Sequence, residues 1–201
     1  NWGIPTSPTF GIVQSTQPNG YYDSLDGLSD TTLRLALQDI IANPSTVRAQ
    51  TYADVIDILK EADQNPANSN EVWLVYTEQG RAKLDYQLTS NNFGKWNREH
   101  TYPKSLGNPN LGSSGPGSDS HHLRPSDVGY NSQRGNLKFT DGSGDSGNSS
   151  GGWYPGDEWK GDVARMMMYM YIRYGDRCKP NVVGIGSSSA TPDDMIDLFL
   201  K

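Results

Sequence analysis

Segments with helical or strand patterns lie toward the two ends of this 201-residue chain, and a long centre poor in aliphatic residues separates them. Apolar residues recur at helical spacing after Ser29 and over residues 52–62, and the apolar run over 72–76 is typical of a buried strand. Beyond the centre, the pattern predicts a helix over 159–174 and a short last helix over 192–200. Because this order does not build βαβ units, it predicts an α+β fold with a small irregular sheet.

The length fits a single domain that can bury a core. Residues 1–20 hold three of the 12 prolines and are predicted to form an extended N-terminal arm, which leaves residues 21–201 as one domain. No run of 18 apolar residues occurs, which excludes a spanning helix. A single cysteine, Cys178, excludes an internal disulfide framework and a metal site built from several cysteines.

The chain centre, residues 95–138, carries all three histidines. Glu99 stands next to His100, so a hard oxygen ligand for a divalent cation adjoins a base that titrates near neutrality. Such a pair alone is most often a solvated strand end. On an ideal strand the two side chains point to opposite faces, so a shared site requires a distorted strand end or a substrate phosphate between metal and base.

A second polar cluster follows over residues 119–136. A short helix capped by Ser126 or Asp127 would place Asn131 and Arg134 on one face, where the first offers a neutral oxygen ligand and the second a planar fork for phosphate. His121 and His122 are adjacent and cannot easily serve one metal, so a zinc site is not indicated.

These clusters, taken in order, resemble a known family. The chain is similar to the endonuclease I family of secreted or periplasmic bacterial nucleases, which have a ββα-metal (His-Me finger) core. The resemblance covers residues 21–175. It is carried by the patterns Asn97-Arg98-Glu99-His100, Asp119-x-His121-x-Leu123-x-Pro125 and Asn131-x-x-Arg134-x-Asn136.

The resemblance implies a mostly helical single domain around a ββα-metal core at residues 95–138. It also implies a metal-dependent, non-sequence-specific endonuclease that cuts DNA and also RNA. His100 matches the general base that activates water, and Glu99 and Asn131 match the two protein ligands of the metal. The implied cofactor is Mg²⁺, with Mn²⁺ or Ca²⁺ as substitutes. A cation on the phosphate would stabilise the phosphorane and the leaving group.

The family also places an arginine against the phosphate, in a stretch that does not align here. Between His100 and Asp119 the chain has no arginine and one lysine, Lys104. Arg134 is therefore the first candidate for a catalytic phosphate contact and Arg124 the second, with Lys104 beside them as a phosphate-binding residue. For each arginine, a structural ion pair is an equal alternative.

The charge distribution bears on the expected partners. The chain has a net charge of -6, but residues 95–138 carry six basic and three acidic residues, a net +3. This balance suits a protein that grips a few phosphates and releases them, and argues against nucleic acid as a permanent partner. DNA and RNA are therefore expected as substrates, with no membrane and no obligate protein partner, for a monomer.

Family resemblance implies an extracellular or periplasmic location. A first residue other than methionine, Asn1, is typical of a mature chain from which a signal peptide has been removed.

Two unusual stretches have simpler interpretations. The Gly/Ser/Asp-rich residues 141–148 faintly resemble a calcium loop, but they lack the EF-hand spacing, and a flexible surface loop is favoured. The methionines over 166–170 lie on the predicted late helix, where they are expected to fill the core.

Two other functions remain open from the sequence. The first is a secreted metal-dependent phosphodiesterase that acts on another phosphate ester with the same three residues. The second is a non-catalytic carbohydrate-binding or surface-binding module, which the five tryptophans and 11 tyrosines would suit. That module would require Glu99, His100 and Asn131 to be accidental.

Overall fold

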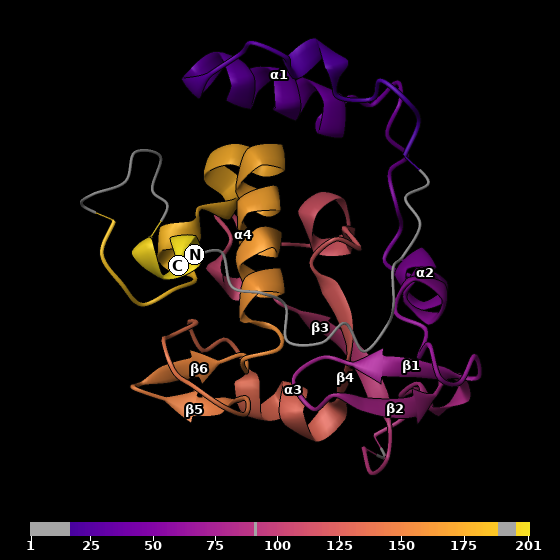
Figure 1. Ribbon diagram of the computed structural model, residues 1–201. Coiled ribbons are helices and arrows are strands. Elements are labelled where there is room, and N and C mark those ends of the chain that lie inside the picture. Colours follow the sequence, from indigo (N-terminus) through magenta and orange to yellow (C-terminus); the bar gives the residue numbers. More distant parts are fainter. Residues whose placement is uncertain (1–16, 91, 189–195) are drawn as a thin grey trace. The chain divides into compact units, whose positions relative to one another are not determined.

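The computed structural model describes residues 17–90, 92–188 and 196–201, in two compact units, residues 1–47 and 48–201 (Figure 1). In the first unit, a short 3-10 turn, Asp23–Leu25, precedes helix α1, Asp30–Ala42. The predicted N-terminal arm falls largely outside the described residues, and the single domain over 21–201 stays a prediction.

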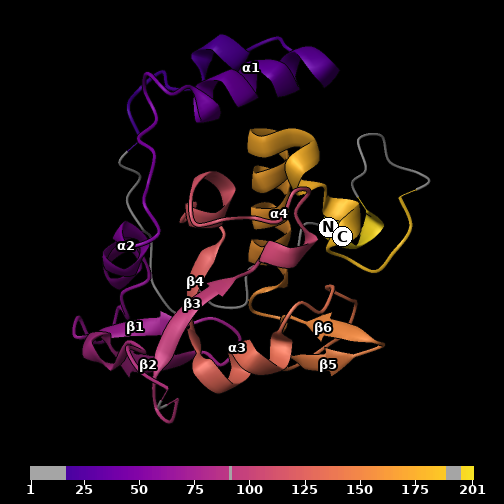
Figure 2. The ribbon, with the colours of Figure 1, turned by 180° about the vertical axis from the view of Figure 1, so that it is seen from behind.

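The described residues of the second unit form three separate two-stranded antiparallel sheets and three α-helices (Figures 1 and 2). The fold is therefore α+β, as predicted. The strand pairs are β1 (Glu71–Leu74) with β2 (Gln79–Ala82), β3 (Trp96–His100) with β4 (Leu123–Asp127), and β5 (Gly147–Ser149) with β6 (Gly152–Tyr154). The helices are α2 (Asp54–Ala62), α3 (Val128–Arg134) and α4 (Lys160–Tyr174).

The hairpin of β3 and β4 runs directly into α3, and both views show the helix continuing from the end of the hairpin (Figures 1 and 2). Of the two possible caps, the structure uses Asp127, whose carboxylate accepts hydrogen bonds from the Gly129 N–H at 2.8 Å and the Tyr130 N–H at 3.3 Å. Gly135, with a φ of 54°, ends the helix in a left-handed conformation that favours glycine. The turn from strand to helix is thus fixed by local chemistry.

Two apolar clusters support this hairpin. Trp96 and Leu123 belong to a cluster formed with α2 and β1, while a larger cluster gathers around α4. Met166, Met167 and Met170 are buried in the second cluster, which confirms the expected core role for these three, whereas Met168 is 39% exposed. Burial of each such side chain contributes about 1.5–3 kcal/mol.

Of residues 141–148, which were expected to form a surface loop, 141–146 lie outside helices and strands, and 147 and 148 begin the hairpin of β5 and β6. Its turn residues, Ser150 and Gly151, both have positive φ, at 45° and 80°. Such a pair matches the right-handed twist of two flanking strands, so a two-residue turn can close the hairpin. The loop expected over 141–148 is thus found over 141–146, and only its last two residues pair with β6.

Residues 107–118 contain one 3-10 turn, Gly115–Ser118, with Pro116 in its first turn. The described part of the last predicted helix is a 3-10 turn, Asp197–Leu200, and residues 192–195 lie outside the described residues. In the part of the chain that the structure describes, no helix has the length and apolar character needed to cross a bilayer.

A buried carboxylate, Asp119, joins the segment before β4 to helix α4. It accepts hydrogen bonds from the Tyr174 hydroxyl at 2.7 Å and the Tyr169 hydroxyl at 3.1 Å, and it pairs with Arg173 at 2.7 Å. On its own segment, the backbone N–H of His121 donates to it at 3.0 Å. Burial alone would raise the pKa of Asp119, but hydrogen bonds from His121 and Tyr174 and the charge of Arg173 hold that pKa below its usual range.

We expect Asp119→Asn to lower the free energy of unfolding by about 3–5 kcal/mol, because it removes the buried negative charge that pairs with Arg173 at 2.7 Å. Since the folded pKa of Asp119 is depressed, the wild-type advantage is present at neutral pH. It shrinks as the pH falls below about 4, the ordinary carboxyl pKa. Urea denaturation across this pH range measures both effects.

The matched control is Asp176→Asn, at a carboxylate that is 88% exposed and pairs with Lys179 at 3.4 Å. It should change the free energy of unfolding by less than about 0.5 kcal/mol. Equal losses in the two variants would show that Asp119 does not hold α4 in place.

Candidate active site

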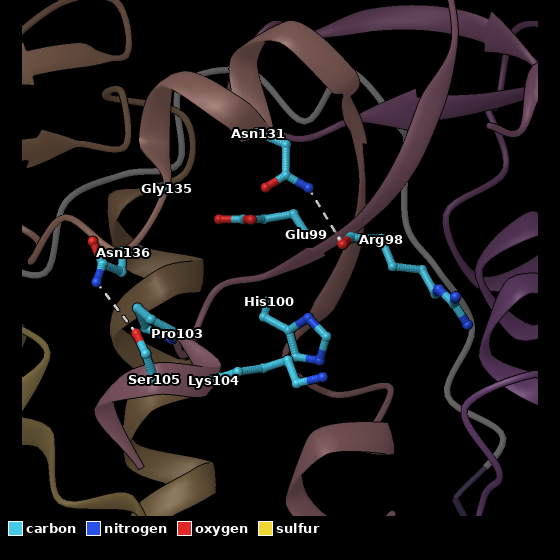
Figure 3. Close-up of a pocket in the computed structure, with 9 residues that line it drawn as sticks. All are labelled: Arg98, Glu99, His100, Pro103, Lys104, Ser105, Asn131, Gly135 and Asn136. Atoms are coloured by element: carbon cyan, nitrogen blue, oxygen red, sulfur yellow. Dashed lines mark hydrogen bonds between the residues drawn. The ribbon is translucent and has the colours of Figure 1, made fainter. Parts of the chain in front are cut away.

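A cavity of about 260 Å³ opens beside the end of β3 and the C-terminal half of α3 (Figure 3). Both Glu99 and His100 line it, although neighbours on an ideal strand point to opposite faces. The expectation of a distorted strand end is consistent with His100 being the last residue of β3. The lining is formed by Arg98, Glu99, His100, Pro103, Lys104, Ser105, Asn131, Gly135 and Asn136.

Glu99 is a buried carboxylate, 2% exposed. Two donors contact the same one of its two oxygens. The Tyr76 hydroxyl donates to Oε1 at 2.9 Å, and Nη1 of Arg134 lies 3.1 Å from the same atom. Burial raises the pKa of Glu99, whereas the charge of Arg134 and the hydrogen bond from Tyr76 oppose this rise. Figure 3 shows the carboxylate extending into the cavity between Asn131 and His100.

Arg134 is wholly buried and does not line the cavity. Besides its pairing with Glu99, its guanidinium donates to the backbone carbonyls of His100 at 2.8 Å and Thr101 at 2.7 Å. Of the two roles weighed for this residue, the structure shows the ion pair. Its donors hold the end of β3 against α3, so a direct contact between Arg134 and a phosphate has no support in this geometry.

Asn131 presents its side-chain oxygen to the cavity because its amide nitrogen is held elsewhere. Nδ2 donates to the side-chain oxygen of Asn97 at 2.7 Å and to the backbone carbonyl of Arg98 at 3.3 Å. A backbone carbonyl can only accept a hydrogen bond, so this contact fixes which end of the amide is nitrogen. In Figure 3 the remaining oxygen lies on the same side as the Glu99 carboxylate.

Two buried imidazoles, those of His100 and His122, form hydrogen bonds to consecutive backbone carbonyls of the turn at Gly115–Ser118. Nε2 of His100 lies 3.0 Å from the Gly117 carbonyl, and Nε2 of His122 lies 2.6 Å from the Pro116 carbonyl. Each Nε2 must carry the proton, because a carbonyl oxygen only accepts. Nδ1 of His122 accepts from the Tyr102 N–H at 3.4 Å, whereas no protein donor among the described residues reaches Nδ1 of His100, which keeps its lone pair.

The imidazole of His100 is neutral at physiological pH. Burial lowers its pKa to about 3, and the neighbouring His122 and the positive charges of Lys104 and Arg98 act in the same direction. Tyr52 packs on one side of the ring, with centroids 5.7 Å apart. A neutral imidazole with a free Nδ1 lone pair is a proton acceptor by its chemistry.

The other two candidates for phosphate binding differ in position. Lys104 lines the cavity, and Figure 3 shows its side chain running beneath the His100 ring. Arg124 does not line it, because its guanidinium donates to the backbone of Ser120 at 3.0 Å and lies 3.8 Å from Asp63. The structure thus brings Lys104 to Glu99 and His100 and leaves Arg124 apart.

The donor set fits a hard divalent cation. Glu99 and Asn131 contribute a carboxylate and an amide oxygen, which Mg²⁺ prefers, and Mg²⁺ commonly keeps several water ligands besides one or two protein groups. Within residues 17–90, 92–188 and 196–201, no cluster of three or more His, Cys, Asp or Glu could hold a metal. A zinc centre built from several such groups is therefore not supported in the described part of the chain.

Several residues of the site could not be found from the sequence. Tyr76 lies 23 positions before Glu99 and meets it only through the tertiary fold. The carbonyls of Pro116 and Gly117 carry no side-chain signal at all. Asn97 and Asn136 were part of the recognised motifs, but nothing in those motifs indicated that Asn97 orients Asn131 or that Asn136 lines the cavity.

The sequence of the chain matches a known family. The model of the family described as Endonuclease I matches residues 29–201, so the chain belongs to the endonuclease I family, as the sequence motifs predicted. The match begins in the first compact unit and extends through the whole of the second.

Two curated relatives are both named extracellular ribonuclease. The protein from Bacillus amyloliquefaciens is 42% identical over 177 residues, which cover 85% of this chain and 59% of the relative. The protein from Bacillus subtilis (strain 168) is 42% identical over 169 residues, covering 81% of this chain and 56% of the relative. The chain thus spans somewhat more than half the length of these relatives. No solved structure matches it.

Gly117 lies against the backbone of Gly112, and a Cβ added at Gly117 would come within 1.8 Å of the Gly112 carbonyl oxygen. We expect Gly117→Ala to push the turn away from His100 and to lower the free energy of unfolding by about 1–3 kcal/mol. Denaturant titration measures the stability. Nitrogen chemical shifts of the imidazoles report whether His100 keeps its proton on Nε2.

Gly112→Ala is the matched control, because an added Cβ at Gly112 meets nothing within 4 Å. This variant should keep both the stability and the imidazole shifts of the wild type. An unchanged His100 signal in Gly117→Ala would show that the Gly117 carbonyl does not set the tautomer.

Proposed function

We propose that the chain is a metal-dependent, non-sequence-specific endonuclease that hydrolyses phosphodiester bonds of RNA and also DNA, with β3, β4 and α3 as a ββα-metal core. One observation carries this proposal. The Glu99 carboxylate and the Asn131 side-chain oxygen face the same cavity as an imidazole, His100, whose Nδ1 is free to take a proton. Membership of the endonuclease I family supports it.

His100 acts as the general base in the proposed mechanism. Its Nε2–H is held by the Gly117 carbonyl, which orients Nδ1 and fixes the ring against rotation. A water between Nδ1 and the phosphorus loses its proton to the imidazole as its oxygen attacks. Positioned proton transfer of this kind contributes about 10²–10⁴-fold to rate. The attack breaks the bond between phosphorus and the 3′ oxygen, which takes a proton from solvent water, so the products carry a 5′-phosphate and a 3′-hydroxyl.

Glu99 and Asn131 would hold the cation. Arg134 and Asn97 keep these two groups in place, from α3 and β3. When bound, a divalent cation such as Mg²⁺, or Mn²⁺ or Ca²⁺ in its place, supplies positive charge that stabilises the phosphorane-like transition state and the leaving oxygen. The two protein oxygens leave room for water and a phosphate oxygen beside them.

Lys104 is the residue we assign to the substrate phosphate. It lines the cavity beside His100, and no ion pair of Lys104 is found among the described residues. An ammonium group with no carboxylate partner offers a point charge to a phosphate oxygen. Recognition through phosphate rather than base edges accounts for a lack of sequence specificity.

RNA is proposed as a substrate because both curated relatives are named ribonucleases. A mechanism in which His100 activates water does not use the 2′-hydroxyl, so it extends to DNA as well. The names of these relatives also support a proposed extracellular location. The chain is proposed to act as a monomer.

Cleavage of RNA and of supercoiled plasmid tests the proposal. We expect the wild type to cut both with Mg²⁺ and neither with EDTA. The rate of His100→Ala should fall by about 10²–10⁴-fold, because no group remains to take the proton from water. Products of wild-type cleavage should carry 5′-phosphates, detected by labelling with and without prior phosphatase treatment.

His121→Ala is the control for this experiment, since its side chain is 59% exposed and does not line the cavity. It should cut at nearly the wild-type rate. Cleavage that persists in EDTA, or a His100→Ala variant as fast as the wild type, would overturn the mechanism. Cyclic phosphate ends on RNA would point to attack by the 2′-hydroxyl.

Asn131→Ala removes one proposed cation ligand and keeps the carboxylate. We expect the Mg²⁺ concentration for half-maximal cleavage to rise by about 10-fold or more, since each ligand adds to affinity. Asn136→Ala is the matched control, because this amide also lines the cavity but bonds Ser105 at 3.3 Å. Its Mg²⁺ requirement should match that of the wild type. The same requirement in Asn131→Ala would remove Asn131 from the ligand set.

A further inference from the structure

The phenol of Tyr76 is bonded to the proposed cation ligand from outside the hairpin. Its hydroxyl donates to Oε1 of Glu99 at 2.9 Å, and both side chains are buried, at 4% and 2% exposure. Tyr76 does not line the cavity that holds His100. Any influence of Tyr76 on chemistry in that cavity must therefore pass through Glu99.

The backbone at Tyr76 is held in a conformation that side-chain-bearing residues rarely adopt, with a φ of 71°. Two contacts keep it there. The Ser146 hydroxyl donates to the Tyr76 carbonyl at 2.7 Å, and the tyrosine ring packs edge-on against Trp153, with centroids 5.4 Å apart. A left-handed tyrosine persists only where its surroundings over-determine it.

One explanation of this hydrogen bond is that it only satisfies the buried hydroxyl of Tyr76, and the other is that it positions the Glu99 carboxylate for a cation. The carboxylate oxygen that Tyr76 contacts distinguishes the two. Tyr76 and Arg134 both contact Oε1, at 2.9 and 3.1 Å. An oxygen with two donors has both lone pairs engaged, so it cannot also bind a cation. The second oxygen, Oε2, is the one left for the cavity.

We propose that Tyr76 is a positioning residue that makes Glu99 a one-oxygen cation ligand, with Oε2 presented to the cavity. The inference rests on the proposed function, because it concerns the cation that Glu99 and Asn131 would hold. Hydrogen-bond partners that orient a ligand typically change metal affinity by about 10–100-fold when they are removed. Loss of the phenol hydroxyl would free Oε1 and let the carboxylate rotate.

Tyr76→Phe tests this inference, with direct Mn²⁺ binding measured without substrate by electron paramagnetic resonance of the free ion. We expect the Mn²⁺ dissociation constant of the variant to rise by about 10–100-fold. The unfolding temperature without metal is measured on the same samples. Tyr102→Phe is the matched control, because it removes a buried tyrosine's hydroxyl that bonds the Lys179 carbonyl at 3.1 Å. It should bind Mn²⁺ like the wild type.

A second variant keeps the test decisive if Tyr76→Phe folds poorly. Ser146→Ala retains the phenol but releases the backbone of Tyr76. It should also weaken Mn²⁺ binding, by a smaller factor. Wild-type Mn²⁺ affinity in the folded Tyr76→Phe variant, with or without a lower unfolding temperature, would overturn the positioning role. A wild type that binds no Mn²⁺ would instead overturn the proposed metal site itself.

Discussion

The buried pair of Arg134 and Glu99 is the interaction on which the site depends, because it joins helix α3 to the end of β3 at 3.1 Å. Removing two charges from water is costly, and their mutual attraction offsets this only when further hydrogen bonds satisfy both groups. Here the guanidinium also donates to the carbonyls of His100 and Thr101, and the carboxylate also accepts from Tyr76. The same bonds that make the pair tolerable therefore fix the strand end from which Glu99 and His100 reach the cavity.

The His100 side of the cavity is held by hydrogen bonds to backbone carbonyls rather than by an ion pair. The turn at Gly115–Ser118 offers two successive carbonyls to His100 and His122, so neither ring can rotate without losing its bond. Gly117 makes this possible, since any side chain there would collide with the backbone of Gly112. The Gly117 carbonyl holds the neutral base, and Arg134 holds the carboxylate. The side chains of the site therefore have little conformational freedom before a ligand binds.

Local patterns in the sequence predicted the elements well, and contacts between distant segments escaped prediction. The α+β class, the late helix with most of its methionines buried and a helix cap at either Ser126 or Asp127 all follow from spacing and side-chain chemistry within a few residues. The motifs also predicted the family. The sequence could not distinguish the two roles of Arg134, because an arginine suits both an exposed phosphate contact and a buried ion pair with Glu99. Burial, which only the fold supplies, separates the two.

The charge balance of the cavity bears on how an anionic substrate and a cation would enter together. Glu99 is the one acid among the nine described residues of the lining, and Arg134 already compensates it from behind, while Arg98 and Lys104 add positive charge at the wall. A cation entering alone would meet no net negative charge. A phosphodiester brings that charge with it, so on the proposed mechanism each ligand strengthens the binding of the other, as linkage requires. The overall charge of -6 does not oppose this, because residues 95–138 carry a net +3 of their own. Two positive side chains, Arg98 and Lys104, beside a single carboxylate thus suit a site that binds a polyanion only together with a metal cation.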